Sequence, residues 1–143
     1  MKAIVTYYSH KGKTAAYARE IAMYLWSRGV SVSLCSISDC TPEKLAGCDL
    51  LLLGCWTCGW FFFNQRPHPK WVEFARSLPR PTGARLLLFT TYKIRTGSLY
   101  RRMSQALGVD ASAAVPRLGS RTGRLSVADK AVLDDFITRV SSK

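Results

Sequence analysis

The chain has 143 residues, of which 48% are apolar, and a formal net charge of +12. This length suits one domain with a single core, so we expect residues 1–143 to form one domain, and the apolar fraction excludes a disordered chain. No apolar run reaches the length of a membrane span and the first one starts almost at Met1, so we expect no membrane segment and no signal peptide, and we predict a cytoplasmic location.

The first predicted strand, residues 3–7, is separated from the first helical pattern by a short polar loop. The loop consists of Ser9, His10, Lys11, Gly12, Lys13 and Thr14. A loop between a strand and a helix collects unpaired backbone N–H groups and the positive end of the helix dipole, which favours a phosphate. Hydroxyl groups, lysines and a glycine strengthen this prediction, and a well-capped, solvated turn is the alternative.

Five segments have the composition of strands. They are residues 3–7, 30–35, 50–53, 86–89 and 112–118. The continuous apolar runs at 50–53 and 86–89 are typical of central parallel strands that are covered on both faces. The segment 30–35 alternates, and the segment 112–118 contains Pro116, which a sheet tolerates only at an edge or a bulge, so we expect both to be edge strands.

Apolar residues at helical spacing predict four helices, three between these strands and one after the last strand. Gly29 marks the end of the first helix, Thr41 caps a short turn, Ser98 caps another helix, and Ser126 with Asp129 begins the last one in the manner of a capping box. The predicted inward faces are Ala18, Ile21, Ala22 and Leu25; Trp71, Phe74, Ala75 and Leu78; Met103, Ala106 and Leu107; and Leu133, Phe136, Ile137 and Val140.

This alternation predicts an α/β fold of three layers, in which helices cover both faces of a five-stranded parallel sheet. The two weak strands, second and fifth, favour the strand order 2-1-3-4-5. In that order the connections reverse direction between strands one and three, and ligands bind beyond the carboxyl ends of the strands at this point. We therefore expect the loops after strands one, three and four to surround one crevice.

Aromatic residues follow the third and fourth predicted strands, in the segments 54–63 and 90–97. A planar ligand ring gains from aromatic walls, by about 0.5–1.5 kcal/mol for each well-placed pair in addition to buried area. Core packing or a partner-binding patch is the alternative, and we expect some of Phe61, Phe62 and Phe63 to bury against an insertion, a second subunit or a partner.

The loop that begins at Ser9 resembles the phosphate loop of flavodoxins, whose pattern is Thr/Ser-x-Thr/Ser-Gly-x-Thr. Ser9, Gly12 and Thr14 match, and Lys11 stands where a hydroxyl residue is usual. The segment from Gly12 to Thr14 also matches the tail of a nucleotide-binding P-loop. That motif needs a glycine where Tyr7 stands and an aspartate after an apolar strand, whereas Asp49 precedes one, so flavodoxin is the better match.

The resemblance extends over essentially the whole chain and implies a flavodoxin-like electron-transfer protein that binds one FMN. It places Ser9, His10, Lys11, Gly12, Lys13 and Thr14 at the phosphate. It places Trp56, Thr57, Cys58, Gly59 and Trp60 on one side of the flavin ring, and Thr91, Tyr92, Lys93 and Arg95 on the other. The sequence leaves open whether Trp56 or Trp60 forms the inner wall.

The positive charge is concentrated in one half of the chain. Between Trp60 and Leu125 only Glu73 and Asp110 oppose the basic residues, which are Arg66, Lys70, Arg76, Arg80, Arg85, Lys93, Arg95, Arg101, Arg102, Arg117, Arg121 and Arg124. Such a field attracts an acidic protein, an anionic cofactor or, non-specifically, nucleic acid, and solubility alone is the alternative. We expect an acidic redox partner, and no motif supports specific nucleic-acid binding. Positive charge from Lys93 and Arg95 beside the ring predicts a less negative potential for full reduction than flavodoxins usually have.

The five cysteines have no disulfide-scaffold spacing, so we expect free thiols. Cys55 and Cys58 have the spacing of a redox dithiol. Such a pair needs a helix N-terminus after it, whereas Gly59 and an aromatic run follow here. A zinc site would need a second pair of ligands with similar spacing, which the sequence lacks. We therefore interpret the pair as incidental. His10 and His68 suggest no catalytic pair.

Three functions remain open from the sequence. The first is an FMN-binding electron carrier, which would not be a stand-alone enzyme. The second is a binding module with a degenerate flavin site and a basic docking face. The third is a small FMN-dependent reductase that passes electrons from NAD(P)H to an acceptor. The partner's identity and the oligomeric state are not determined by the sequence.

Overall fold

The computed structural model has a five-stranded sheet at its centre, and it describes residues 1–9, 12–45, 47–60, 63–78, 84–92, 96–108 and 115–141. The strand order is β2-β1-β3-β6-β7, and every neighbouring pair is parallel. The strands are β1 (Lys2–Tyr8), β2 (Ser31–Ser36), β3 (Leu50–Trp56), β6 (Arg85–Thr91) and β7 (Arg117–Ser120). Numbered within this sheet alone, the order is 2-1-3-4-5, so the predicted topology is confirmed.

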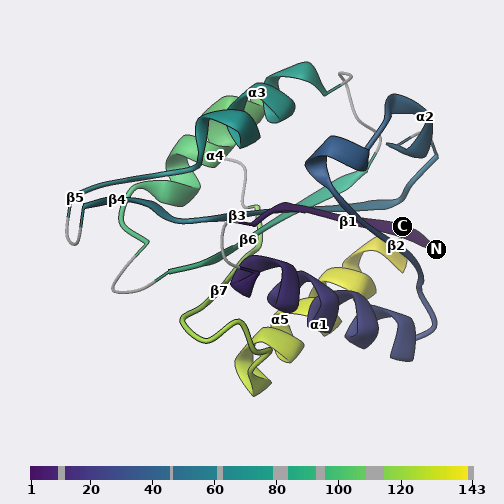
Figure 1. Cartoon of the computed structure of the whole chain (residues 1–143). Helices are drawn as coiled ribbons and strands as arrows, with labels where there is room; N and C mark the ends of the chain where they lie inside the picture. Colours follow the sequence, from purple (N-terminus) through teal and green to yellow (C-terminus); the bar gives the residue numbers. More distant parts are fainter. Residues whose placement is uncertain are drawn as a thin grey trace.

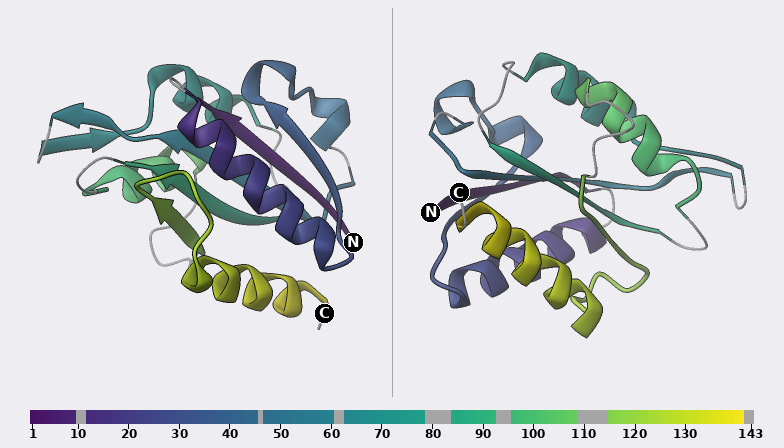
Figure 2. Two further views of the ribbon diagram at one scale, coloured as in Figure 1. Left: turned by 60° about the horizontal axis from the view of Figure 1, so that its bottom comes forward. Right: turned by 180° about the vertical axis from the view of Figure 1, so that it is seen from behind.

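Helices cover both faces of the sheet, as Figures 1 and 2 show. One layer contains α1 (Lys13–Ser27) and α5 (Val127–Ser141), and the other contains α3 (Pro69–Ser77) and α4 (Leu99–Leu107). A short segment after β2 forms the turn η1 (Ile37–Asp39) and the helix α2 (Pro42–Leu45). None of the described helices has the length and apolarity that a bilayer span requires.

The two cores explain why the central strands are continuously apolar. Leu52 and Leu87 belong to the core under α1 and α5, whereas Leu51, Leu53 and Leu88 belong to the core under α3 and α4. Successive side chains of a strand point to opposite faces, so a strand covered on both sides needs apolar residues at every position.

A hairpin that the sequence analysis did not predict follows β3. Its strands β4 (Cys58–Trp60) and β5 (Phe63–Arg66) pair antiparallel with an irregular register and extend beyond the main sheet, as Figure 1 shows. The hairpin occupies the segment where we expected a loop. Phe61 and Phe62, for which we predicted burial against an insertion or partner, lie outside the described residues, and Phe63 belongs to β5.

One predicted strand boundary and one predicted side-chain cap were wrong. The fifth strand begins at Arg117, later than predicted, because Pro116 cannot donate to the ladder; its carbonyl accepts from the Leu88 N–H at 3.0 Å. Ser98 precedes α4, but its hydroxyl does not cap the helix and donates instead to the Gln65 carbonyl at 2.9 Å.

The other predicted helix ends are confirmed. Gly29 has φ 84° after α1, and Thr41 Oγ1 accepts from the Lys44 N–H at 3.4 Å. Ser126 and Asp129 form a reciprocal capping box before α5, with both bonds at 3.1 Å. These caps end the helices where the sequence indicated.

Side-chain hydrogen bonds join α5 to α1. The Tyr17 hydroxyl donates to Asp129 Oδ2 at 2.8 Å in a buried contact, and Glu20 accepts from the Leu125 N–H at 2.8 Å. Burial, reinforced by Asp129, raises the pKa of Tyr17 well above its ordinary value, so this hydroxyl remains a donor at any ordinary pH. The last helix and the segment before it therefore help to hold α1 in place.

Candidate functional site

The loop before α1 is closed by the hydroxyl of Ser9. Its Oγ accepts hydrogen bonds from the Gly12 N–H at 3.0 Å and from the Ala15 N–H at 3.3 Å. Gly12 has φ 87°, and among the described residues, its chain neighbours apart, no heavy atom lies within 4 Å of the position that a Cβ would take there. The backbone is therefore open to close approach from outside at this residue. His10 and Lys11 lie outside the described residues.

The first turn of α1 is favourable to an anion. The helix has 15 residues, begins at Lys13 and has no acidic residue in its first turn. Its positive dipole end and the Lys13 side chain therefore act in the same direction. This end of α1 lies at the carboxyl edge of the sheet, directly after β1, where the strand order changes direction.

Thr14 faces the sheet and not the open side of the loop. Its Oγ1 is buried and lies 2.7 Å from Oγ1 of Thr91 at the end of β6. The hydroxyl that we predicted at the phosphate thus holds the start of α1 against the sheet.

Three threonines also join the ends of β3 and β6. The Thr57 N–H donates to the Thr91 carbonyl at 2.9 Å, and the hydroxyls of Thr57 and Thr90 lie 2.9 Å apart. The Thr90 hydroxyl donates to the Cys55 carbonyl at 2.5 Å. Ser9, Gly12, Thr14, Thr57 and Thr91 are therefore brought to one edge of the sheet, as the predicted crevice requires.

An aromatic group lies at the same edge, on the side of α3 and α4. The ring of His68 is 4.6 Å from that of Tyr8 and 6.0 Å from that of Trp56. His68 Nδ1 accepts from the Lys70 N–H at 3.1 Å and so caps α3, which places the proton of the neutral ring on Nε2. We call Tyr8, Trp56 and His68 the edge aromatics.

Sequence reasoning identified Trp56 but missed Tyr8 and His68. Tyr8 is opposite Cys55 in the register of β1 and β3, so its place at this edge follows only once that pairing is known. His68 stands directly before Pro69, the first residue of α3, and a proline at the first helical position is a signal that the residue before it caps the helix.

Tyr92 lies toward the other edge of the sheet. Its N–H donates to the Ser120 carbonyl at 3.1 Å, and a Cβ on Gly119 would be 3.1 Å from its ring. The guanidinium carbon of Arg121 is 5.7 Å from the ring centroid. Cys58, Gly59 and Trp60 lie in β4, where only their backbone is described, and Lys93 and Arg95 lie outside the described residues.

The described cysteines are free thiols, as predicted: Cys35, Cys40, Cys48 and Cys55. Cys55 is fully buried, and its Sγ accepts from the His68 N–H at 3.4 Å. A buried sulfur in this contact is inaccessible to an incoming disulfide, which favours the interpretation of Cys55 and Cys58 as an incidental spacing.

Cys35 is expected to react faster than an ordinary thiol. A hydrogen bond from the Cys40 thiol lowers the pKa of Cys35 to about 7, and this bond, together with burial, raises the pKa of Cys40. Above the lowered pKa Cys35 is mostly thiolate, whereas an unperturbed thiol at pH 7 is only roughly 3% ionised. The rate of Cys35 alkylation by iodoacetamide, followed by peptide mass spectrometry, should rise around neutral pH.

Two substitutions of Cys40, whose thiol donates to Cys35, test this prediction. Cys40→Ala removes the donor and should move the alkylation profile to higher pH, whereas Cys40→Ser retains a donor and should move it less. An unchanged profile in Cys40→Ala would mean that the Cys35 thiolate is not stabilised by Cys40.

Solved structures of similar shape include flavodoxins and a larger oxidoreductase. No protein-family model and no curated protein sequence matches the chain. Two-electron reduced flavodoxin from Megasphaera elsdenii matches with a TM-score of 0.78 and 25% identity, over 97% of this chain and 99% of that one. A flavodoxin from the domain Archaea matches with a TM-score of 0.73 and 21% identity, over 99% of both chains. Rubredoxin oxygen:oxidoreductase from Desulfovibrio gigas matches with a TM-score of 0.71 and 17% identity, over 99% of this chain and 36% of that one.

Proposed function

We propose that this chain, which has the fold of flavodoxins, binds one FMN and transfers electrons to and from a protein partner. The observation that carries the proposal is the loop from Ser9 to Thr14, which leads into α1 at the point where the sheet order reverses. In folds of this kind, ligands bind at that point. A cytoplasmic location is part of the same proposal.

The residues present at the loop fit a phosphate. Gly12 leaves the backbone open, Ser9 holds the turn closed, and Lys13 adds positive charge at a helix end without acidic neighbours in its first turn. Backbone N–H groups at such an end are suited to a phosphate because their dipoles point toward it. Thr14 contributes by anchoring the helix to β6.

The walls of the flavin ring are assigned to the loops after β3 and β6. Trp56 is the last residue of β3 and Tyr92 directly follows β6. Thr57 joins the two strand ends through its contacts with Thr90 and Thr91. The flavin, when bound, supplies the one- and two-electron chemistry, and the residues of this chain orient it and exclude water from its inner face. Residues 58–60 complete the proposed site, as do Lys93 and Arg95.

A binding module without flavin is the second candidate, and two observations favour it. The Thr14 hydroxyl is used within the fold, and the Tyr92 ring already packs over Gly119 beneath Arg121. The Thr14 contact competes with phosphate binding, and the Tyr92 contact competes with binding of the flavin ring.

Titration with FMN separates these candidates. Binding at micromolar Kd, with quenching of flavin fluorescence, is expected for the electron carrier. Riboflavin should bind more weakly, because it lacks the phosphate that the loop would hold. Unchanged FMN fluorescence at these concentrations would contradict the proposal and favour the binding module. A loaded protein that oxidises NAD(P)H unaided would instead point to a reductase.

A further inference from the structure

A groove of about 570 Å³ lies between α3 and α4, next to the end of β5. Its floor is apolar and includes Pro67, Val72 and Ala106. Its rim carries three arginines, one from each of the three surrounding elements: Arg66, Arg76 and Arg102. This groove is distinct from the crevice at the edge of the sheet.

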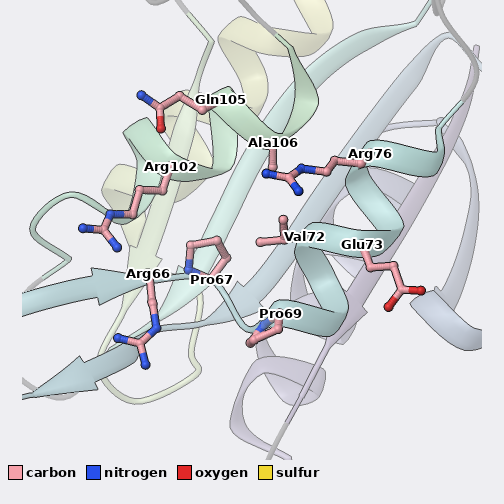
Figure 3. Close-up of a pocket in the computed structure, with 9 residues that line it drawn as sticks. All are labelled: Arg66, Pro67, Pro69, Val72, Glu73, Arg76, Arg102, Gln105 and Ala106. Atoms are coloured by element: carbon pink, nitrogen blue, oxygen red, sulfur yellow. The ribbon is translucent and has the colours of Figure 1, made fainter.

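Arginines outnumber acidic residues at the groove, where Glu73 is the one acidic residue among those that line it. In Figure 3, Arg76 extends from α3 toward Ala106, Arg66 and Arg102 lie on the other side of Pro67, and the carboxylate of Glu73 points away from all three. Within the part of the chain that the structure describes, neither Arg76 nor Arg102 has an ion-pair partner. Their charges therefore remain available to a ligand.

The walls of the groove are held in place by packing below it. Ser98 donates to the Gln65 carbonyl and so ties the end of β5 to the start of α4. Trp71 on α3 and Met103 on α4 are fully buried in the same core. Fixed walls reduce the entropy that binding must overcome, because the backbone positions that carry the arginines are already in place.

The exposure of the rim decides between a small ligand and a protein. Arg66 and Arg76 are exposed, so a small anion bound to them would remain largely in water, whereas small-molecule sites bury most of their ligand. Arginines around an apolar floor are typical of protein interfaces. Carboxylates of a partner would pair with the arginines while an apolar side chain occupied the floor.

We propose that this groove, the α3–α4 groove, docks an acidic segment of the protein that exchanges electrons with this chain. The proposal rests on the proposed function, which supplies the need for such a partner. It also assigns to one surface the acidic partner that the charge distribution predicts.

The position of the groove suits electron exchange. Pro67 and Pro69 line the groove, and His68 between them has its ring against Tyr8 and near Trp56. One short segment therefore borders the groove with its prolines and contacts the edge aromatics with its histidine. A partner in the groove would lie beside the proposed flavin site.

The test is a binding measurement that does not depend on flavin. A short fluorescein-labelled peptide rich in glutamate, with interspersed leucines, is titrated with the full chain, and its anisotropy is followed. Arg76→Glu combined with Arg102→Glu is compared with Arg19→Glu combined with Arg101→Glu. The second pair makes the same change of charge at helix positions that do not line the groove.

We expect the groove pair to raise the peptide Kd by about tenfold or more, and the matched pair to raise it only by about twofold. An equal rise of the peptide Kd in the two double variants would show that the peptide responds only to the net charge of the chain, and this would overturn the proposal. A wild-type chain that does not bind the peptide would also overturn it.

FMN titration of the same proteins keeps the two proposals apart. Both pairs should bind FMN as the wild type does, because neither touches the loop before α1. Peptide binding through the groove without FMN binding by the wild type would contradict the proposed function and the electron-transfer part of this inference. FMN binding without groove-dependent peptide binding would overturn the groove proposal and leave the proposed function standing.

Discussion

Replacement of Ser9 by aspartate is expected to abolish tight FMN binding while leaving the fold intact. Ser9 Oγ accepts from the N–H groups of Gly12 and Ala15, and an aspartate oxygen can accept the same two bonds. Its negative charge would also interact favourably with the N-terminus of α1. The same charge would repel a phosphate at this position. We expect a loss of about 2–4 kcal/mol, or roughly 30- to 1,000-fold in Kd.

Riboflavin is the informative control for this variant because it lacks the phosphate. Its affinity should change little in Ser9→Asp, and the free energy of unfolding should be unchanged or slightly higher. A variant that retains wild-type FMN affinity would show that the phosphate is not held by this loop. Loss of riboflavin binding as well would point to a distorted crevice, not to repulsion of the phosphate.

Replacement of Gly54 by alanine is expected to destabilise the protein by about 3 kcal/mol. Gly54 is opposite Phe89 in the register of β3 and β6, and the Phe89 ring covers it. A Cβ at this position would overlap the ring, which is fully buried and contacts Tyr17 edge to face at 6.0 Å. Urea unfolding measures the change, and Ser33→Ala on the exposed part of β2 should alter stability by less than about 0.5 kcal/mol.

A double variant tests the cause of that loss. Phe89→Leu removes the ring atoms that the new methyl group would meet, so Gly54→Ala should cost less in that background. We expect a coupling of about 1–2 kcal/mol between the two positions. Strictly additive effects would contradict steric overlap as the reason for the glycine.

The sequence was sufficient for the fold because its signals are long and local. Four leucines at 50–53 and the apolar run at 86–89 identify the central strands, and alternation at 30–35 identifies an edge. The candidate phosphate loop could be located for a similar reason, since a strand, a glycine-containing turn and a helix follow one another directly.

Other parts of the site depend on contacts between distant residues. Thr14 and Thr91 are 77 residues apart, and nothing near either one indicates that their hydroxyls pair. The three arginines of the α3–α4 groove come from three different elements. The hairpin was missed because its strands are short and no asparagine–glycine or similar turn joins them.

The hydrogen bond from Tyr17 to Asp129 has a consequence for how the chain matures during synthesis. The two residues are 112 positions apart, so the apolar side of α1 that faces α5 remains uncovered until nearly the whole chain has been made. A ribosome-bound intermediate would present this side of the first helix to chaperones or to other nascent chains. The first helix to be synthesised is thus among the last to be covered by the rest of the fold.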